Sequence, residues 1–195
     1  EHKGPYRYGS IKDKKKNWFI FVCGTAGTEE EDSLVFGKAR YDSETFWYCG
    51  NGSVDVIKDL AFDPERFADR TVVLYGNADT NSAWSSLLKD SPVQVRRGQV
   101  RVGNRSFEGD DLSAYFIQPR RDSKVASVIA VAGSGPAGMR STYSVSFFRS
   151  FVRYPDCLVT RVDKEDAGES ENLAVGFFGL DWTVDNGEFA YADES

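Results

Sequence analysis

Apolar residues along this chain fall mostly into short runs, each followed by glycine and small polar residues. Three of these runs precede a glycine-rich loop: 19–23 before 24–28, 72–75 before 76–81, and 128–132 before 133–138. A short continuous apolar run bounded by turn residues is typical of a strand that is buried on both faces. We therefore predict three buried strands, each leading through its loop into a helix.

Helix signals follow these loops. Thr28 and Glu31 have the spacing of a capping box, in which the Thr28 hydroxyl accepts from the amide of Glu31. That helix should end near residues 50–52, which contain two glycines. A short helix with Trp84 on its apolar face should end before Pro92. A longer helix is predicted from about 136 to 152, with an apolar face of Tyr143, Phe147, Phe148, Phe151 and Val152.

The remaining segments have the character of strands. Residues 93–97 and 99–102 flank Gly98 and predict a hairpin, with a further turn before residues 105–107. Other strands are expected at 54–57, 112–118, 125–132, 157–162 and 173–182. Strands that alternate with helices favour a parallel sheet. We predict a three-layer α/β sandwich, Rossmann-like or flavodoxin-like, with a largely parallel sheet and an antiparallel β-hairpin insertion at about 93–107, lying at one edge or end.

Chain length and net charge limit the domain organisation and the classes of partner that can be expected. With 195 residues, the chain fits a linker or surface-laid arm at 1–16 followed by a single α/β domain at 17–195. Its net charge of −6 argues against a nucleic-acid partner, and the lysines at 12 and 14–16, interrupted by Asp13, are interpreted as a solvated turn. No apolar stretch approaches the length of a membrane span, so no membrane partner is expected. The chain opens at Glu1 without a signal-like segment, which indicates processing or excision from a larger protein.

Cysteine and histidine are scarce. Cys23 and Cys157 fall in predicted strands and should be buried thiols, whereas Cys49 follows the first helix. Three scattered cysteines lack the spacing of a zinc site, and we expect neither a metal nor a cofactor. The single histidine, His2, lies far from every glycine-rich loop. A Ser-His-Asp or Cys-His relay within the chain is therefore not expected.

The loop at 133–138 fits G-x-G-x-x-G between a strand and a helix, which is the local context of a phosphate-binding loop. Asp163, at the end of the next strand, stands where dinucleotide folds often place a ribose-binding acid. The competing interpretation is structural: the glycines permit a tight turn, Ser134 caps the helix, and Pro136 occupies its first turn. The sequence favours this structural interpretation.

Ser134 also raises the possibility of a nucleophile. Ala132 and Pro136 replace the two glycines of the G-x-S-x-G pattern, so the match fails. Substitutes for the missing base would be Lys124, Asp79 or Asp181, and nothing in the sequence places them near Ser134. We expect no catalytic residue in this chain.

The carboxyl ends of parallel strands meet at one sheet edge, so the three loops should converge there. Helix amides at that edge would create a weakly positive hollow suited to a small polar or anionic ligand, such as a phosphate, a nucleotide or a sugar. The candidate ligand-binding residues are Gly24, Thr25, Asn77, Asp79, Asn81, Gly133, Ser134 and Gly135. Turn formation and helix capping would explain the same residues without a ligand.

Three adjacent aromatic residues, Phe46, Trp47 and Tyr48, precede the predicted end of the first helix. They cannot all face one core. Either two are buried with one at the rim, or part of the group forms a partner surface.

Eight segments of the chain resemble one protein family. They read GP, FVCGT, KARYD, ETFWY, GNGSVDV, LYGNADTN, SPVQVRRG and GPAGMR, at 4–5, 21–25, 38–42, 44–48, 50–56, 74–81, 91–98 and 135–140. From about residue 4 to residue 189, the chain resembles the C-terminal region of large bacterial prolyl-oligopeptidase-like or esterase-like α/β-hydrolase proteins. The resemblance implies a catalytic serine-hydrolase domain upstream, an exported parent protein, and no functional residue carried by this region.

Two functions of different classes follow. The first is a non-catalytic accessory domain of a larger secreted hydrolase that packs on, or assists, the catalytic domain. The second is an independent ligand-binding or enzymatic domain that uses the glycine-rich strand-end loops. The histidine count favours the first, and the expected convergence of the loops favours the second.

Overall fold

The structure is a computed structural model and describes residues 2–8, 18–145, 154–162 and 170–192. The helices are α1 (Glu29–Gly50), α2 (Trp84–Leu87) and α3 (Pro136–Ser141), with 3-10 turns η2 (Asp59–Ala61) and η3 (Thr142–Ser144). The strands are β1 (Phe19–Cys23), β2 (Asp55–Lys58), β3 (Thr71–Tyr75), β4 (Val93–Arg96), β5 (Gln99–Val102), β6 (Arg105–Glu108), β7 (Leu112–Pro119), β8 (Ser127–Gly133), β9 (Cys157–Val162), β10 (Ser170–Phe177) and β11 (Glu188–Tyr191).

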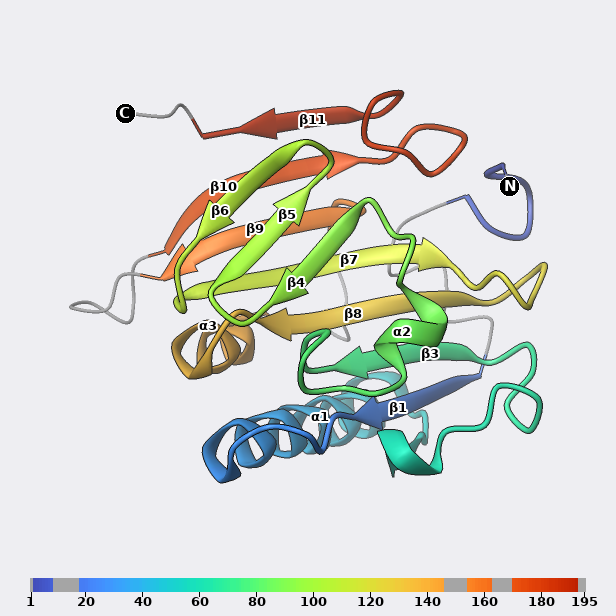
Figure 1. The fold of residues 1–195 in the computed structure, drawn as a ribbon. Helices are drawn as coiled ribbons and strands as arrows, with labels where there is room; N and C mark the ends of the chain where they lie inside the picture. The colour runs from blue at the N-terminus through green and yellow to red at the C-terminus, as the bar shows by residue number, and fades with distance from the viewer. Residues whose placement is uncertain (1, 9–17, 146–153, 163–169, 193–195) are drawn as a thin grey trace.

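The fold is of the α/β class and is built on an eight-stranded mixed sheet in the order β11-β10-β9-β7-β8-β3-β1-β2 (Figure 1). The β2, β1, β3 and β8 strands are parallel to one another, whereas β7, β9, β10 and β11 pair antiparallel with their neighbours. The prediction of a largely parallel sheet is therefore wrong for half of its strands. Only residues 120–126 join β7 to β8, which is too short for a crossover, so the chain returns antiparallel.

The buried strands form the core. Every residue of β1, β3 and β8 is buried, as their continuous apolar runs predict. Neighbouring side chains on a strand point to opposite faces of the sheet. On β7, the hydroxyl of Tyr115 donates to Thr142 O beside α3, whereas the next residue, Phe116, meets Trp84 of α2 edge-on at 6.0 Å. Helices α1 and α3 therefore cover one face, and α2 lies on the other (Figure 1).

The insertion at 93–107 is a separate three-stranded antiparallel sheet, β4-β5-β6. Its position was predicted at an edge or end of the domain, and this is wrong: it lies across a face of the large sheet, with β4 against β8 and β5 against β7 (Figure 1). Alternate residues explain the packing, because Val93, Val95, Val100 and Val102 are all fully buried. Burying each such side chain contributes roughly 1.5–3 kcal/mol, which favours coverage of the face over an exposed ribbon.

The helix predicted at 136–152 ends much earlier. Helix α3 stops at Ser141, and η3 follows it. The hydroxyls of Ser141, Thr142 and Ser144 each donate to the carbonyl three residues before them. Such side-chain bonds compete with the backbone pattern of an α-helix. The apolar face predicted from Phe147 onward lies outside the described residues, as do Asp163 and the lysines at 12 and 14–16.

The strand predicted at 173–182 also ends early, at Phe177. Trp182 adopts a left-handed φ of 66° within a turn in which its amide donates to Gly179 O. The turn brings the chain back as β11, a strand that the sequence analysis did not predict. Two of its residues, Phe189 and Tyr191, stack at 6.1 Å, although neither is fully buried.

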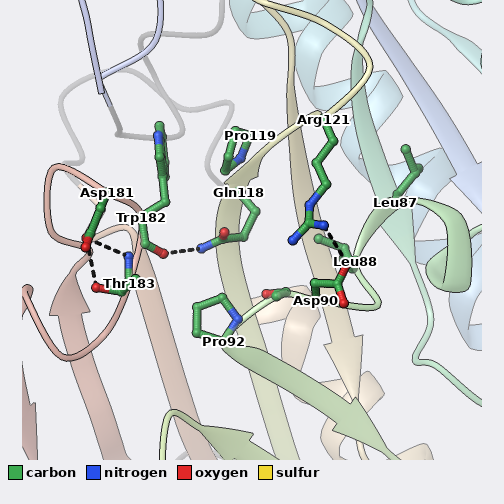
Figure 2. A pocket seen from close by; sticks show the side chains of 11 residues that line it. Leu87, Leu88, Asp90, Pro92, Gln118, Pro119, Arg121, Asp181, Trp182 and Thr183 are labelled. Carbon is green, nitrogen blue, oxygen red and sulfur yellow. Dashed lines mark hydrogen bonds and ion pairs between the residues drawn. The ribbon is translucent and has the colours of Figure 1, made fainter. Parts of the chain in front are cut away.

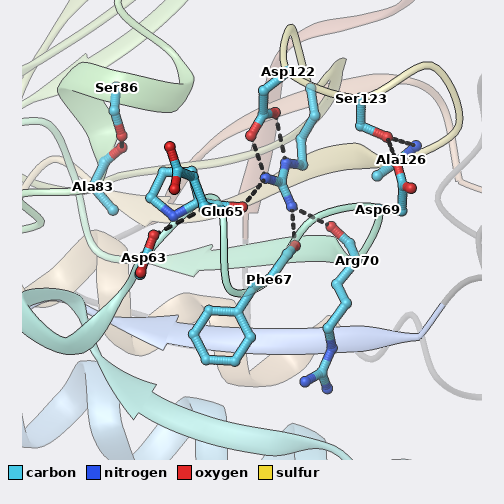
Figure 3. Close-up of polar contacts among 12 residues, drawn as sticks. Asp63, Glu65, Phe67, Asp69, Arg70, Ala83, Ser86, Asp122, Ser123 and Ala126 are labelled. Carbon is cyan, nitrogen blue, oxygen red and sulfur yellow. Dashed lines mark hydrogen bonds and ion pairs between the residues drawn. The ribbon is translucent and has the colours of Figure 1, made fainter.

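The buried side chain of Arg120 connects loops at the amino end of β3 by hydrogen bonds. The guanidinium of Arg120 is completely buried, forms an ion pair with Asp122, and donates to the carbonyls of Phe67 and Arg70 at 2.7 and 2.8 Å. Figure 3 labels these three partners, Asp122, Phe67 and Arg70. From the N-terminal arm, Arg7 donates to the carbonyls of Arg120, Ser123 and Ala126 at 2.7–3.1 Å. The described part of the arm is thus bonded to the domain.

Among the described residues, no helix is both long and apolar enough to cross a membrane. The same residues contain no cluster of three or more histidine, cysteine or acidic side chains placed to hold a metal ion.

Candidate functional site

The three glycine-rich loops converge at the carboxyl ends of β1, β3 and β8, so the predicted common edge is confirmed. The amide of Ala26 donates to Thr80 O at 3.0 Å, which joins the first loop to the second. The side-chain amide of Asn77 donates to Gly133 O at 2.9 Å, which joins the second loop to the third. The sheet topology therefore places the candidate residues together as parallel pairing requires.

The polar groups of these loops bond mainly to one another. Buried Asn81 donates to Val22 O and Tyr75 O at 3.1 and 3.0 Å. The Asp79 carboxylate accepts from the guanidinium of Arg96 at 2.7 Å and from the amide of Arg97 at 2.9 Å. These hydrogen bonds give Asn81 and Asp79 a structural role that requires no ligand.

Thr25 belongs to another internal network. Its hydroxyl donates to Asp59 Oδ1 at 2.6 Å, and Asp59 Oδ2 accepts from the amide of Ser82 at 2.6 Å. Burial, the largest influence, raises the pKa of Asp59, but the hydrogen bonds from Thr25, Ser82 and Leu60 together bring it below its ordinary value. This carboxylate therefore stays ionised and pins the first loop to η2.

The glycines allow close backbone approach. A Cβ at Gly24 would lie 2.4 Å from Thr80 O, and one at Gly133 would lie 2.2 Å from the amide nitrogen of Met139. A Cβ at Gly135 would lie 2.7 Å from Asp110 O. Each glycine thus faces the protein's own backbone at the point where a phosphate-binding loop would approach its ligand.

Ser134 is built into the turn that precedes α3. Its side chain is buried, and its hydroxyl donates to Gly109 O at 2.6 Å and accepts from the amide of Leu112 at 3.1 Å. None of the three substitute bases considered for it contributes to these bonds, and Asp181 lies instead on a groove beyond the opposite edge of the sheet. The only histidine of the chain, His2, is exposed on the arm. This serine has no activated-nucleophile geometry.

The amides at the start of α1 face carboxylates of the protein itself. Thr28 and Glu31 form the predicted capping box, and Gly27 N donates to Asp32 Oδ1 at 3.0 Å. Arg97 holds Glu31 in a two-bond ion pair at 2.7 and 3.0 Å. This pairing lowers the pKa of Glu31 to about 2, with a further contribution from the Thr28 amide. Acidic side chains therefore already complement the helix dipole at this end of α1, where the sequence suggested a weakly positive hollow.

The space left between the loops is very small. The cavity lined by Glu31, Asn77, Thr80, Gly133 and Gly135 has a volume of about 10 Å³. That is room for at most one water molecule. A ligand bound between these described loop residues would have to displace the hydrogen bonds that join them.

A larger groove lies beyond the opposite edge of the sheet, between the end of β7 and the turn after β10 (Figure 2). Its volume is about 400 Å³. Arg121 and Asp90 form an ion pair of 2.5 Å on one wall, and Asp181 on the other accepts from the amide and hydroxyl of Thr183. Hydrogen bonds from Asn186 and Thr183 lower the pKa of Asp181 to about 2. The groove thus carries an ion pair on one wall and, on the other, an Asp181 carboxylate that stays ionised near pH 7.

A third region lies around residues 52–54, where aromatic side chains are exposed. Trp47 and Tyr48 are 58% and 83% exposed, whereas Phe46 turns inward against Phe19 at 5.7 Å. The expectation that the three aromatic residues cannot all be buried is confirmed. Only Phe46 faces inward, so the alternative with two buried residues and one at the rim is not found. Trp18 directly precedes β1 and continues its apolar run in the sequence, yet it is 81% exposed.

No known protein family matches this chain, and no curated protein is significantly similar to it. Function therefore has to be argued from the residues and their geometry.

Proposed function

We propose that this chain is a non-catalytic accessory α/β domain of a larger secreted hydrolase of esterase or peptidase type, packing on or assisting a catalytic domain that precedes it. The single observation that carries the proposal is that, in the described part of the chain, the carboxyl ends of β1, β3 and β8 are closed. In open α/β folds this edge holds the ligand or the reacting groups. Here its glycines, amides and carboxylates bond to one another around about 10 Å³ of space.

The parallel strands support a finer placement of the fold. Their order is β2-β1-β3-β8, which corresponds to the first four strands of a flavodoxin-like sheet and differs from the Rossmann order. A flavodoxin-like domain binds its ligand outside the β1–β3 switch point. In this chain Gly24 and Thr80 pack together there, which supports a scaffold that has lost, or never had, the ligand site.

The test uses the full chain and a purified catalytic domain from the hydrolase group that it resembles. Isothermal titration calorimetry should give a saturable interaction, and size-exclusion chromatography should show co-elution. The catalytic domain alone and an unrelated α/β domain of similar charge serve as controls. Absence of any interaction with such catalytic domains would contradict the proposal.

A thermal-shift screen separates this proposal from its alternative, a small-ligand domain using the strand-end loops. Inorganic phosphate, nucleotides and monosaccharides should leave the melting temperature unchanged. A rise with one of them that Asn77→Ala removes would favour the alternative, because Asn77 joins two of the three loops.

A further inference from the structure

Two hollows flank the segment 52–54 and share its residues. The first, of about 490 Å³, is lined by Trp18, Phe19, Phe46, Asp55 and Arg70 in addition to that segment. The second, of about 320 Å³, is lined by Ser43, Glu44, Trp47 and Tyr48 in addition to that segment. Both volumes fall within or close to the range of small-molecule sites. We call the surface formed by these two hollows the aromatic face.

The aromatic side chains of this face stand on rigid supports. The carbonyl of Trp18 accepts from the amide of Thr71 at 3.0 Å, at the point where β1 and β3 begin. Trp47 and Tyr48 lie in the last turn of α1, whose end is fixed by Asn51 in a left-handed conformation. Strand and helix ends therefore fix the backbone of these residues and leave their rings exposed.

Each hollow combines its aromatic rings with one carboxylate and with serine: Ser53 lines both hollows, and Ser43 lines the second as well. In the first, Asp55 forms an ion pair with Arg70 at 2.7 Å, and Ser53 lies beside it. In the second, Glu44 forms an ion pair with Arg40 at 2.9 Å, near Ser43. Only one oxygen of each carboxylate has a hydrogen-bond partner within the described part of the chain. The other oxygen is left to accept from a ligand.

We propose that the aromatic face binds a neutral oligosaccharide, with adjoining sugar rings in the two hollows. A pyranose ring offers an apolar C–H face, which packs on an aromatic ring, and a rim of hydroxyls, which donate to carboxylates and serines. Because each carboxylate is already paired with an arginine, neither sign of charge is in excess, and an uncharged ligand fits best. This proposal does not depend on attachment to a hydrolase.

The same residues argue against a protein partner at this position. The centres of protein interfaces are depleted in charged groups. Here Glu44 and Asp55 lie inside the hollows, and more than half of each side chain is exposed. Two separate hollows on either side of a short segment also suit successive ring-shaped units.

The experiment titrates the full chain with neutral hexasaccharides of glucose, xylose, mannose and N-acetylglucosamine by calorimetry. Tryptophan fluorescence provides a second readout. Trp84 and Trp182 are buried, so a change on binding reports on Trp18 and Trp47, the other two of the four tryptophans. At least one hexasaccharide should bind and shift this emission.

Trp18→Ala and Tyr48→Ala should each weaken binding about tenfold, equivalent to about 1.4 kcal/mol. Trp18→Tyr should restore part of the affinity, because it keeps an aromatic ring. Phe36→Ala is the matched control, since Phe36 is 54% exposed on α1 outside both hollows. All three substituted side chains are more than half exposed, so circular dichroism should show that the four variants are folded.

Three results would overturn the proposal. The first is the absence of binding by every hexasaccharide. The second is equal affinity for the wild type and the Trp18→Ala and Tyr48→Ala variants. The third is concentration-dependent self-association of the wild type in analytical ultracentrifugation that Trp18→Ala abolishes, which would identify the aromatic face as a protein interface.

Discussion

Lys38 and Asp42 lie one turn apart on α1 and form an ion pair of 2.7 Å in which both side chains are completely buried. Tyr75 of β3 donates its hydroxyl to the second carboxylate oxygen at 3.0 Å, and Lys38 also donates to Val145 O at 2.9 Å. Burial lowers the pKa of Lys38 and raises that of Asp42, and their pairing opposes both changes. The cluster fixes α1 to the sheet through polar contacts.

We expect Lys38→Met to destabilise the protein by about 3–5 kcal/mol, because it leaves the Asp42 carboxylate buried without its cation. The double variant Lys38→Met/Asp42→Leu should recover most of this loss, since it removes both charges. Urea unfolding followed by circular dichroism measures the difference. A double variant as unstable as the single one would show that the pair contributes more than charge compensation.

Thr28→Ala should reduce the free energy of unfolding by about 1 kcal/mol, as the loss of an N-cap usually does. The reason is the hydrogen bond from the Glu31 amide to Thr28 Oγ1. Ser33→Ala, on an exposed position of the same helix, is the control and should change little. Equal urea midpoints for the Thr28 variant and wild type would mean that the cap does not limit the stability of α1.

Glu31 predicts a specific pH dependence of stability. Its pKa in the folded state is about 2, below the ordinary glutamate value, so its contribution is fully present above the unfolded pKa of 4.5. That contribution is lost as the pH falls from about 4.5 toward 2, and it amounts to about 3 kcal/mol at most. Unfolding curves of wild type and Glu31→Gln should therefore differ most above pH 5 and converge near pH 2. A constant difference over that range would exclude this origin.

The chain should show no serine-hydrolase activity, because the hydroxyl of Ser134 is engaged by Gly109 O and Leu112 N and bonds to no basic side chain among the described residues. p-Nitrophenyl acetate and a proline-containing peptide should turn over at the rate of buffer alone. Ser134→Ala and Ser33→Ala are the paired variants. Turnover that only Ser134→Ala abolishes, in a folded variant, would falsify the assignment of a structural role.

Much of the parallel half could be predicted from the sequence, because local signals there agree with the tertiary structure. The run at 19–23 and the Thr28–Glu31 spacing each have one physical interpretation, and both are found. The convergence of the three loops could also be predicted, because parallel pairing brings the carboxyl ends of the strands to one edge of the sheet. How tightly the loops pack could not be predicted, because it depends on contacts such as Asn77 with Gly133, which are distant in sequence.

The predictions that failed concern features that depend on tertiary contacts. The buried valines at 93–102 alternate as in any half-buried hairpin, and only the large sheet determines which surface they cover. Strand β11 contains Glu188, Phe189 and Tyr191 and becomes a strand by pairing with β10. Trp18 continues an apolar run in sequence, yet it precedes β1 and faces solvent. From the sequence, the aromatic face could therefore be predicted only in part, through the expected exposure around Trp47 and Tyr48.

The position of β3 between β1 and β8 has a consequence for biosynthesis. During translation, β1, α1, β2 and β3 leave the ribosome well before β8, the strand that pairs with the other side of β3. Until then, a mainly apolar strand that is wholly buried in the folded domain has an open hydrogen-bonding edge, which favours pairing between nascent chains. Slowing translation across residues 76–126 should therefore increase aggregation of the emerging polypeptide, and chaperone binding should concentrate in the same interval.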